Sequence, residues 1–174
     1  MSTDSKQLAE RFAAAKIVVV DDEHYMRKVV RTMLLSIGVQ NIYDAPDGEA
    51  GLALIRKVAP DVVILDWQMP GLDGPSFVRV VRSPATFPYP NVPIIMLTGH
   101  GERARVVEAV KIGVNEFLLK PVSVKALQDR VASVLTKPRD IVKSGGYYGP
   151  VPRNLASAIH ADNDLAIIDL SLTS

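Results

Sequence analysis

Five polar residues follow apolar segments of this sequence, and together they could form one charged site. Asp21 and Asp22 follow KIVVV, Asp66 follows DVVIL, Thr98 follows PIIML and Lys120 follows EFLL. Carboxylates that share a crevice repel one another, and their pKa values rise unless a cation neutralises them. Because Lys120 balances only one negative charge, we expect a divalent cation as well. Mg²⁺ fits this expectation, since it prefers oxygen ligands and usually takes one or two carboxylates.

Each of these residues also has an ordinary structural explanation. An Asp after a strand is often a helix cap, a lysine stem can lie on apolar surface, and threonine is a common strand residue. Asp66 is harder to explain in this way, because it follows four large apolar residues, where an ionised side chain is costly without partners. The joint position of all five residues favours a functional site.

Short apolar segments alternate along the chain with segments of helical periodicity. The expected strands span residues 17–20, 41–45, 62–65, 93–97 and 116–119. This alternation implies one parallel sheet with helices on both faces and right-handed crossovers. In such sheets ligands bind beyond the carboxyl ends of the strands, which is where the polar residues fall.

The helix expected after the first strand has two different faces. Its apolar face carries Met26, Val29, Val30, Met33, Leu34 and Ile37. Arg27, Lys28 and Arg31 lie on the other face. We therefore assign these three basic residues to the side of the helix away from the core.

Four motifs, in this order and at these separations, resemble the receiver domain of bacterial two-component response regulators, the CheY-like family. They are VVVDDE, VVILDWQMPGLDG, PIIMLTGHG and EFLLKPVS. The resemblance covers residues 15–136 and implies a doubly wound, flavodoxin-like α/β fold with a five-stranded parallel sheet in the order 2-1-3-4-5. It also implies a response regulator that accepts a phosphoryl group from a phosphohistidine of a sensor histidine kinase, with Mg²⁺.

The resemblance assigns roles to the acidic residues. Asp66 matches the aspartate that accepts the phosphoryl group. Asp22 matches the acid that binds Mg²⁺ directly, and Asp21 matches its neighbour that acts largely through water. The backbone carbonyl of Gln68 matches a further metal ligand.

The resemblance also implies a switch. Thr98 matches the hydroxyl that bonds the phosphoryl oxygen, and Lys120 matches the ammonium that pairs with it. Phe117 matches an aromatic residue that turns inward on activation, and it lacks the hydroxyl that tyrosine supplies in some members. We expect the change to reach a face made by the fourth helix, the fifth strand and the fifth helix, where partners bind.

Gln68 and His100 are candidates for setting the lifetime of the phosphorylated form. Each stands two residues after a matched position, Asp66 or Thr98, on a loop beside the acceptor. The alternative is that they are ordinary loop residues that face solvent.

Several functions remain open at this point. The chain could end a signalling pathway through a protein contact, or pass the phosphoryl group to a phosphotransfer histidine. A haloacid dehalogenase type phosphatase is disfavoured, because Gln68 occupies the position of its general acid. A flavodoxin-like cofactor site is disfavoured by the acids after the first strand, and a degenerate receiver by the intact residue set. We expect no enzyme activity beyond the chain's own phosphorylation and dephosphorylation.

Composition excludes several other classes. The 174 residues include 20 basic and 19 acidic ones, spread without a basic patch, so no nucleic-acid surface is expected. No window is long and apolar enough for a membrane span, and cysteine is absent. A cytoplasmic protein without a membrane association is the expectation.

The termini extend beyond the resemblance. Residues 1–14 form an N-terminal segment, and residues 137–174 form a Gly- and Pro-rich linker followed by an apolar arm, with no separate output domain. The arm either packs on a second copy, giving a homodimer, or packs back on its own domain. The face around the fourth helix, fifth strand and fifth helix is a second candidate for dimerisation.

Overall fold

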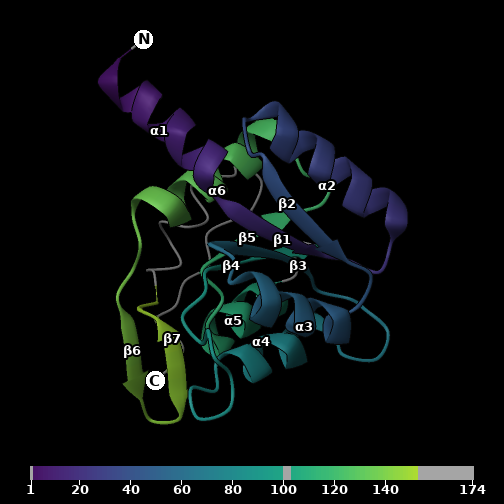
Figure 1. The fold of residues 1–174 in the computed structure, drawn as a ribbon. Coiled ribbons are helices and arrows are strands. Elements are labelled where there is room, and N and C mark those ends of the chain that lie inside the picture. The colour runs from purple at the N-terminus through teal and green to yellow at the C-terminus, as the bar shows by residue number, and fades with distance from the viewer. Residues whose placement is uncertain (1, 100–102, 153–174) are drawn as a thin grey trace.

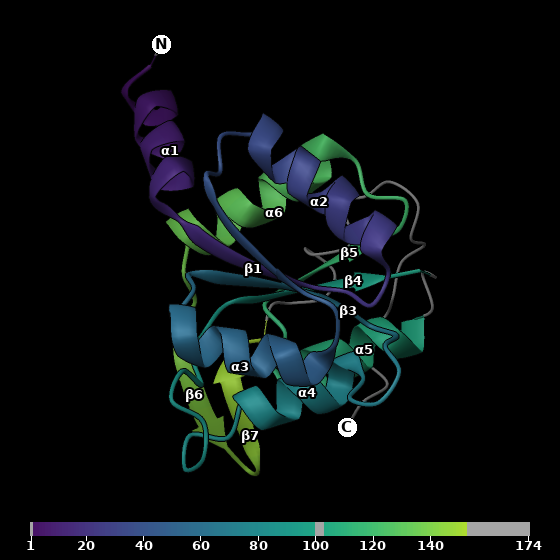
Figure 2. The same cartoon turned by 45° about the vertical axis from the view of Figure 1, so that its right-hand side comes forward.

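The computed structural model describes residues 2–99 and 103–152. A five-stranded parallel sheet lies between two layers of helices (Figures 1 and 2). Its strand order is β2-β1-β3-β4-β5, which confirms the predicted fold class and strand order. No helix among the described residues combines the length and the apolar character that crossing a membrane requires.

The strands begin and end close to the predicted positions. The sheet consists of β1 (Lys16–Val20), β2 (Asn41–Ala45), β3 (Val62–Asp66), β4 (Ile94–Thr98) and β5 (Glu116–Leu119). The helices are α1 (Thr3–Ala14), α2 (His24–Ser36), α3 (Gly48–Val58), α4 (Gly74–Val81), α5 (Arg103–Ile112) and α6 (Val124–Thr136). Asp47, Asp73 and Ser123 cap α3, α4 and α6 by accepting a backbone N–H through the side chain.

Alternating residues of each strand divide the core into two clusters. Val18, Leu65 and Met96 face α3, α4 and α5 on one side of the sheet. Val19 and Ile64 face α1, α2 and α6 on the other side. Because both faces are covered, β3 and β4 are buried throughout, as expected for the central strands of a parallel sheet.

The first helix was not predicted from the sequence. α1 begins after Ser2, whose hydroxyl accepts the backbone N–H of Ser5. Phe12 is buried near its end, and Arg11 donates a 2.8 Å hydrogen bond to the carbonyl of Leu135 in α6. α1 therefore packs against the end of α6, beside β1.

A second unpredicted element is an antiparallel hairpin of β6 (Ile141–Ser144) and β7 (Tyr147–Pro150). Gly145 and Gly146 form its turn, both with positive φ. β7 lies against α5, and Figures 1 and 2 show the hairpin on the same side of the sheet as α4 and α5. Part of the segment interpreted as a linker is thus regular structure in contact with the domain.

Arg82 connects the segments beneath this hairpin. Its buried guanidinium donates hydrogen bonds of 2.7–2.9 Å to four acceptors. These are the carbonyls of Gly113, Pro90 and Val92 and the side-chain oxygen of Asn115. Burial lowers the pKa of Arg82 to about 10, so the group stays charged at neutral pH.

Candidate functional site

A pocket of about 690 Å³ lies at the carboxyl ends of β1, β3, β4 and β5. Its lining includes Asp22, Glu23, Asp66, Gln68, Gly99 and Lys120. The parallel sheet places the carboxyl ends of these strands at one edge, where open α/β sheets bind their ligands. The pocket therefore gathers residues that are far apart in the sequence.

Three carboxylates meet at this pocket. Asp21, Asp22 and Asp66 each place an oxygen within 4.8 Å of the others. Asp21 is 1% exposed and Asp66 is 5% exposed, whereas Asp22 is open to solvent. Asp21 Oδ1 accepts the backbone N–H of Glu23 at 2.9 Å, but its buried Oδ2 has no hydrogen-bond partner among the described residues.

Lys120 supplies the nearest positive charge. Its Nζ donates a 2.9 Å hydrogen bond to Asp66 Oδ1 and lies 3.8 Å from Asp21 Oδ2. The second distance is too long for a hydrogen bond, so Lys120 stabilises the charge of Asp21 by electrostatic attraction alone. Lys120 directly follows β5, and β4 lies between β5 and β3 in the sheet.

Burial, together with the excess of negative charge, shifts the pKa values at this site. Burial raises the pKa of Asp21 to about 6, with the charges of Asp66 and Asp22 adding to the effect. Burial also raises the pKa of Asp66, against the opposing hydrogen bond and charge of Lys120. For Lys120, burial acts to lower the pKa, but the hydrogen bond and charge of Asp66 outweigh it and raise the pKa above its ordinary value.

Thr98 and Phe117 lie on one face of the sheet, the face that α3, α4 and α5 cover. Side chains alternate along a strand, so Thr98 shares the face of Met96, two residues earlier. Met96 pairs with Phe117, and both belong to the core cluster under α5. The pocket lining includes Gly99 but not Thr98, among the residues that the structure describes. Thr98 is 2% exposed, and its neighbour Gly99 lines the pocket.

Of the two residues expected to set the lifetime, one can be placed. Gln68 is exposed and lines the pocket two residues after Asp66. His100 lies outside the described residues.

Comparison with known proteins agrees with this geometry. The family model of the response regulator receiver domain matches residues 17–132. The chain belongs to this family. The receiver domain thus accounts for the sheet and for every strand that contributes to the pocket.

Relatives of this receiver domain include chemotaxis proteins. It is 30% identical over 122 residues to chemotaxis protein CheY-3 of Vibrio cholerae, covering 70% of this chain and 92% of the relative. It is 36% identical over 121 residues to chemotaxis protein CheY1 of Helicobacter pylori, covering 69% of this chain and 96% of the relative. The match covers nearly all of each relative, so the ends of this chain are its distinguishing parts.

Solved structures show the same fold. The CheX–CheY–BeF₃–Mg²⁺ complex from Borrelia burgdorferi is similar with a TM-score of 0.64 and 26% identity, covering 71% of this chain and 90% of that chain. That complex, by its description, holds Mg²⁺ and a beryllofluoride group.

The acids of this receiver domain suit a hard divalent cation. All three donors are carboxylate oxygens, and the buried Asp21 Oδ2 lacks a hydrogen-bond partner among the described residues. A buried carboxylate oxygen of this kind is costly unless a cation or donor faces it. Asp21, Asp22 and Asp66 would hold such an ion, as Mg²⁺ chemistry favours.

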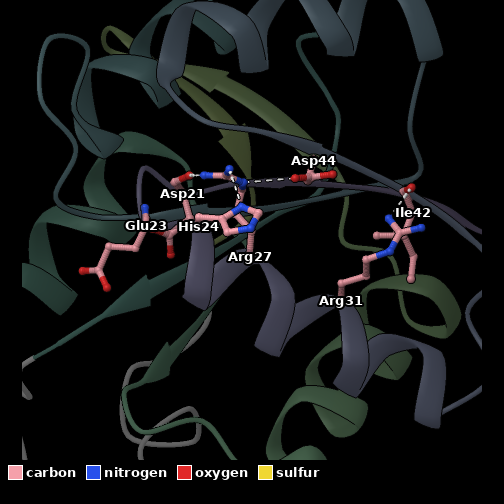
Figure 3. A network of polar contacts seen from close by, with 7 residues as sticks. All are labelled: Asp21, Glu23, His24, Arg27, Arg31, Ile42 and Asp44. Atoms are coloured by element: carbon pink, nitrogen blue, oxygen red, sulfur yellow. Dashed lines mark hydrogen bonds and ion pairs between the residues drawn. The ribbon is translucent and has the colours of Figure 1, made fainter.

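Arg27 is the residue near the site that sequence reasoning missed. We placed it on the side of its helix away from the core, but its side chain is only 12% exposed. Figure 3 shows its guanidinium turned toward Asp21 and Asp44. Helical periodicity separates core-facing from solvent-facing positions, and it carries no information on a long side chain that reaches past the first turn of its helix.

Proposed function

We propose that this receiver domain accepts a phosphoryl group on Asp66 from a phosphohistidine of a sensor histidine kinase or phosphotransfer protein. One observation carries the proposal. Asp66 lies in a pocket with two further carboxylates and the ammonium of Lys120, at the carboxyl edge of the sheet. The proposed output is a changed protein contact, and the chain acts as an enzyme only on itself.

The transfer breaks the nitrogen–phosphorus bond of the donor and forms an oxygen–phosphorus bond to an Asp66 carboxylate oxygen. The products are an aspartyl phosphate and an unphosphorylated histidine. Such transfers depend mainly on positioning and on stabilising the charge of the transferred oxygens. Lys120, already 2.9 Å from Asp66, is placed to pair with one of those oxygens.

A Mg²⁺ ion bound at the three acids would supply positive charge, which would keep Asp66 ionised and offset the charge of the transferred group. The proposed ligands are Asp22 directly, Asp21 largely through water, Asp66 and the backbone carbonyl of Gln68. The CheY complex from Borrelia burgdorferi, which contains Mg²⁺, supports this assignment by similarity.

The proposed switch connects Asp66 with the surface made by α5, β5 and α6. Because α1 was not predicted, these elements are the fourth helix, fifth strand and fifth helix expected from the sequence. The phosphoryl group attracts the hydroxyl of Thr98, and the space that Thr98 leaves is filled by the ring of Phe117. Thr98 and Phe117 share one face of adjacent strands, which supports this coupling. Partners read the resulting change in the α5–β5–α6 surface.

Gln68 and His100 are proposed to control how fast water removes the phosphoryl group. Gln68 is exposed at the pocket, where it can contact an attacking water. We expect Gln68→Ala to change the rate of autodephosphorylation, as measured by loss of label over time. An unchanged rate in Gln68→Ala and in His100→Ala would remove both residues from this role.

The proposal is tested by incubating the protein with acetyl phosphate and Mg²⁺ and measuring the intact mass. The wild-type chain should gain one phosphoryl group, and the gain should disappear when EDTA removes the metal. Asp66→Asn should gain none, because an amide is a poor nucleophile. Asp61→Asn is a suitable control, since Asp61 directly precedes β3, at the end of the strand opposite Asp66.

A wild-type protein that stays unmodified under all of these conditions would refute the proposal. So would equal labelling of Asp66→Asn. If labelled protein transfers its phosphoryl group back to a histidine phosphotransfer protein, the chain is an intermediate of a phosphorelay. If it does not, this protein is the last acceptor of the phosphoryl group in its pathway.

Dimerisation stays a prediction. The apolar arm expected to mediate it lies largely at residues 153–174, outside the described residues. The second candidate surface, around α5, β5 and α6, is tested by comparing the solution mass of the protein with and without acetyl phosphate.

A further inference from the structure

The end of β1 is held in place from α2 and β2. The backbone N–H of Asp21 donates to the carbonyl of Ala45 at 3.2 Å, which extends the β1–β2 ladder by one residue. The carbonyl of Asp21 accepts a 2.8 Å hydrogen bond from the guanidinium of Arg27. Both polar groups of this backbone residue therefore have fixed partners.

Arg27 is in turn fixed by an acid at the end of β2. Its Nε donates a 3.0 Å hydrogen bond to Asp44 Oδ2, and another guanidinium nitrogen lies 3.3 Å from His24 Nδ1 (Figure 3). The guanidinium has donors in a rigid planar fork, so it can bridge the Asp21 carbonyl and the Asp44 carboxylate at once. The bridge connects the acidic edge of β1 with β2.

Helix stability does not explain this position of Arg27. The residue lies in the first turns of α2, close to the positive end of the helix dipole, where a cation is disfavoured. α2 also has no acidic residue in its first turn, and its N-cap Glu23 makes no side-chain cap hydrogen bond. The contacts with Asp21 and Asp44 are what favour the guanidinium here.

The neighbouring Arg31 shows what a simple tether between α2 and β2 looks like. Arg31 lies four residues further along α2 and donates a 3.1 Å hydrogen bond to the carbonyl of Ile42 in β2 (Figure 3). It carries the same charge and joins the same two elements. Only Arg27 also reaches the strand that ends in the acidic pocket.

The bridge made by Arg27 fixes the backbone position from which the side chain of Asp22, the exposed acid of the pocket, extends. The carbonyl of Asp21 and the N–H of Asp22 belong to one planar peptide unit, so holding the carbonyl orients the Cα of Asp22. The hydrogen bond from Glu23 to Asp21 Oδ1 orients the other side chain. Asp22 is exposed to solvent, so the direction of its backbone matters for where its carboxylate lies.

We propose that Arg27, anchored by Asp44, is a positioning residue for the metal-binding acids, and that it strengthens divalent-cation binding although it is itself a cation. This proposal rests on the proposed Mg²⁺ site. Partners in the outer shell of a metal site typically change metal affinity 10- to 100-fold when removed. The effect opposes simple electrostatics, because removing a positive charge near a cation site should tighten cation binding.

The test is a Mg²⁺ titration of the full chain, followed by the fluorescence of Trp67. This residue lines the pocket directly after Asp66 and is the only tryptophan of the chain. Arg27→Met should weaken Mg²⁺ binding by about tenfold or more. Arg31→Met, the matched control that removes the same charge, should bind Mg²⁺ within about twofold of wild type, or slightly tighter.

Two further variants separate positioning from charge. Arg27→Lys keeps the charge but loses the planar fork, so it should also weaken Mg²⁺ binding. Asp44→Asn should weaken binding in the same direction, and the Arg27→Met/Asp44→Asn double variant should be no worse than Arg27→Met alone. That pattern is expected when two residues act as one unit.

Each outcome has a defined meaning. Unchanged or tighter Mg²⁺ binding by Arg27→Met, with normal binding by wild type, overturns the positioning role and leaves the proposed function intact. Absence of Mg²⁺ binding by wild type overturns both. Metal-dependent stabilisation against thermal unfolding gives a second measure of affinity, and unfolding of each variant in EDTA shows separately whether it folds.

Discussion

Lys120 donates a 2.9 Å hydrogen bond to Asp66 across the width of an intervening strand, since β4 lies between β3 and β5. This one ammonium faces two buried carboxylates, because Asp21 Oδ2 is 3.8 Å away. The pocket therefore keeps an excess of negative charge after Lys120 is counted. That excess is the physical basis for cation binding at the site.

Lys120→Met should change Mg²⁺ affinity and the rate of phosphorylation in opposite directions. Without the ammonium the pocket is more negative, so Mg²⁺ should bind at least about tenfold tighter, a change of about 1.4 kcal/mol. Phosphorylation by acetyl phosphate should nevertheless slow by about 10²-fold, since removing one donor to a developing negative charge costs that much. Trp67 fluorescence gives the affinity and intact mass gives the rate.

The control for Lys120→Met is Lys125→Met. Lys125 carries the same charge on the exposed surface of α6, where it pairs with Asp129 at 3.2 Å. The Mg²⁺ affinity and the phosphorylation rate of Lys125→Met should stay within about twofold of wild type, because exposed charges are strongly screened. Slow phosphorylation in both variants would show that overall charge, and not the contact with Asp66, controls the reaction.

Stability without metal should fall as the pH rises from about 4 to about 6. The pKa of Asp21 is raised from 3.8 to about 6 in the folded protein, so the folded state holds a proton that the unfolded state has released in this window. This group stabilises the fold below pH 4 and loses roughly 3 kcal/mol of that contribution by pH 7. Asp66, whose pKa is also raised, acts in the same direction.

Urea unfolding in EDTA at several pH values measures this dependence. Asp21→Asn removes the titrating group, so its stability should be less steep in the same window. Mg²⁺ should reduce the slope in wild type, because a bound cation favours the ionised carboxylates. A slope that is identical in wild type and Asp21→Asn would contradict the assignment to Asp21.

The sheet and the acidic pocket were predictable because their signals are local. Apolar runs such as Val62–Leu65 identify buried strands, and parallel connections bring their carboxyl ends together. Asp66 and Lys120 could therefore be placed at the same edge of the sheet from their positions at the ends of predicted strands. The hydrogen bond between them required the structure.

Other features have no comparable signal. Arg27 looks like a surface residue by periodicity, and its role depends on Asp44, 17 residues later in the chain. The hairpin of β6 and β7 has few residues and a Gly–Gly turn, which is also typical of a linker. Its stability comes from contacts with α5 and the loop before β4, which periodicity does not detect.

The chain should tolerate truncation after Pro152 better than truncation after Thr136. Ending at Thr136 removes Arg139, which donates to the carbonyls of Asn115 and Val151, and Tyr148, which donates to Asn91. Hydrogen bonds from charged groups contribute about 1.5–3 kcal/mol, so the shorter chain should lose roughly 2 kcal/mol or more. Urea unfolding of both truncated chains measures the difference.

The same pair of chains also clarifies any test of dimerisation. A dimer that is lost after truncation at Thr136 but kept after truncation at Pro152 depends on the hairpin. A dimer lost in both depends on residues 153–174. Equal stability of the two chains would contradict the view that the hairpin is part of the folded domain.

Gly74 is predicted to be essential for the shape of the pocket. A Cβ at this position would lie 2.7 Å from the carbonyl oxygen of Asp66 and 2.9 Å from the Cα of Trp67. Both neighbours are backbone atoms, so no flexible side chain can move aside. Gly74→Ala should cost about 1–3 kcal/mol in unfolding free energy, as insertion into a packed region does.

The backbone shift that relieves this clash must displace the end of β3, where the N–H of Gly74 donates to the carbonyl of Trp67 at 2.9 Å. Gly74→Ala should therefore weaken Mg²⁺ binding and slow labelling by acetyl phosphate. Gly99→Ala is the control, since no atom of the described residues lies within 4 Å of the added methyl group, and it should change stability by less than about 0.5 kcal/mol. Normal labelling of a destabilised Gly74→Ala protein would show that the end of β3 can shift without displacing Asp66.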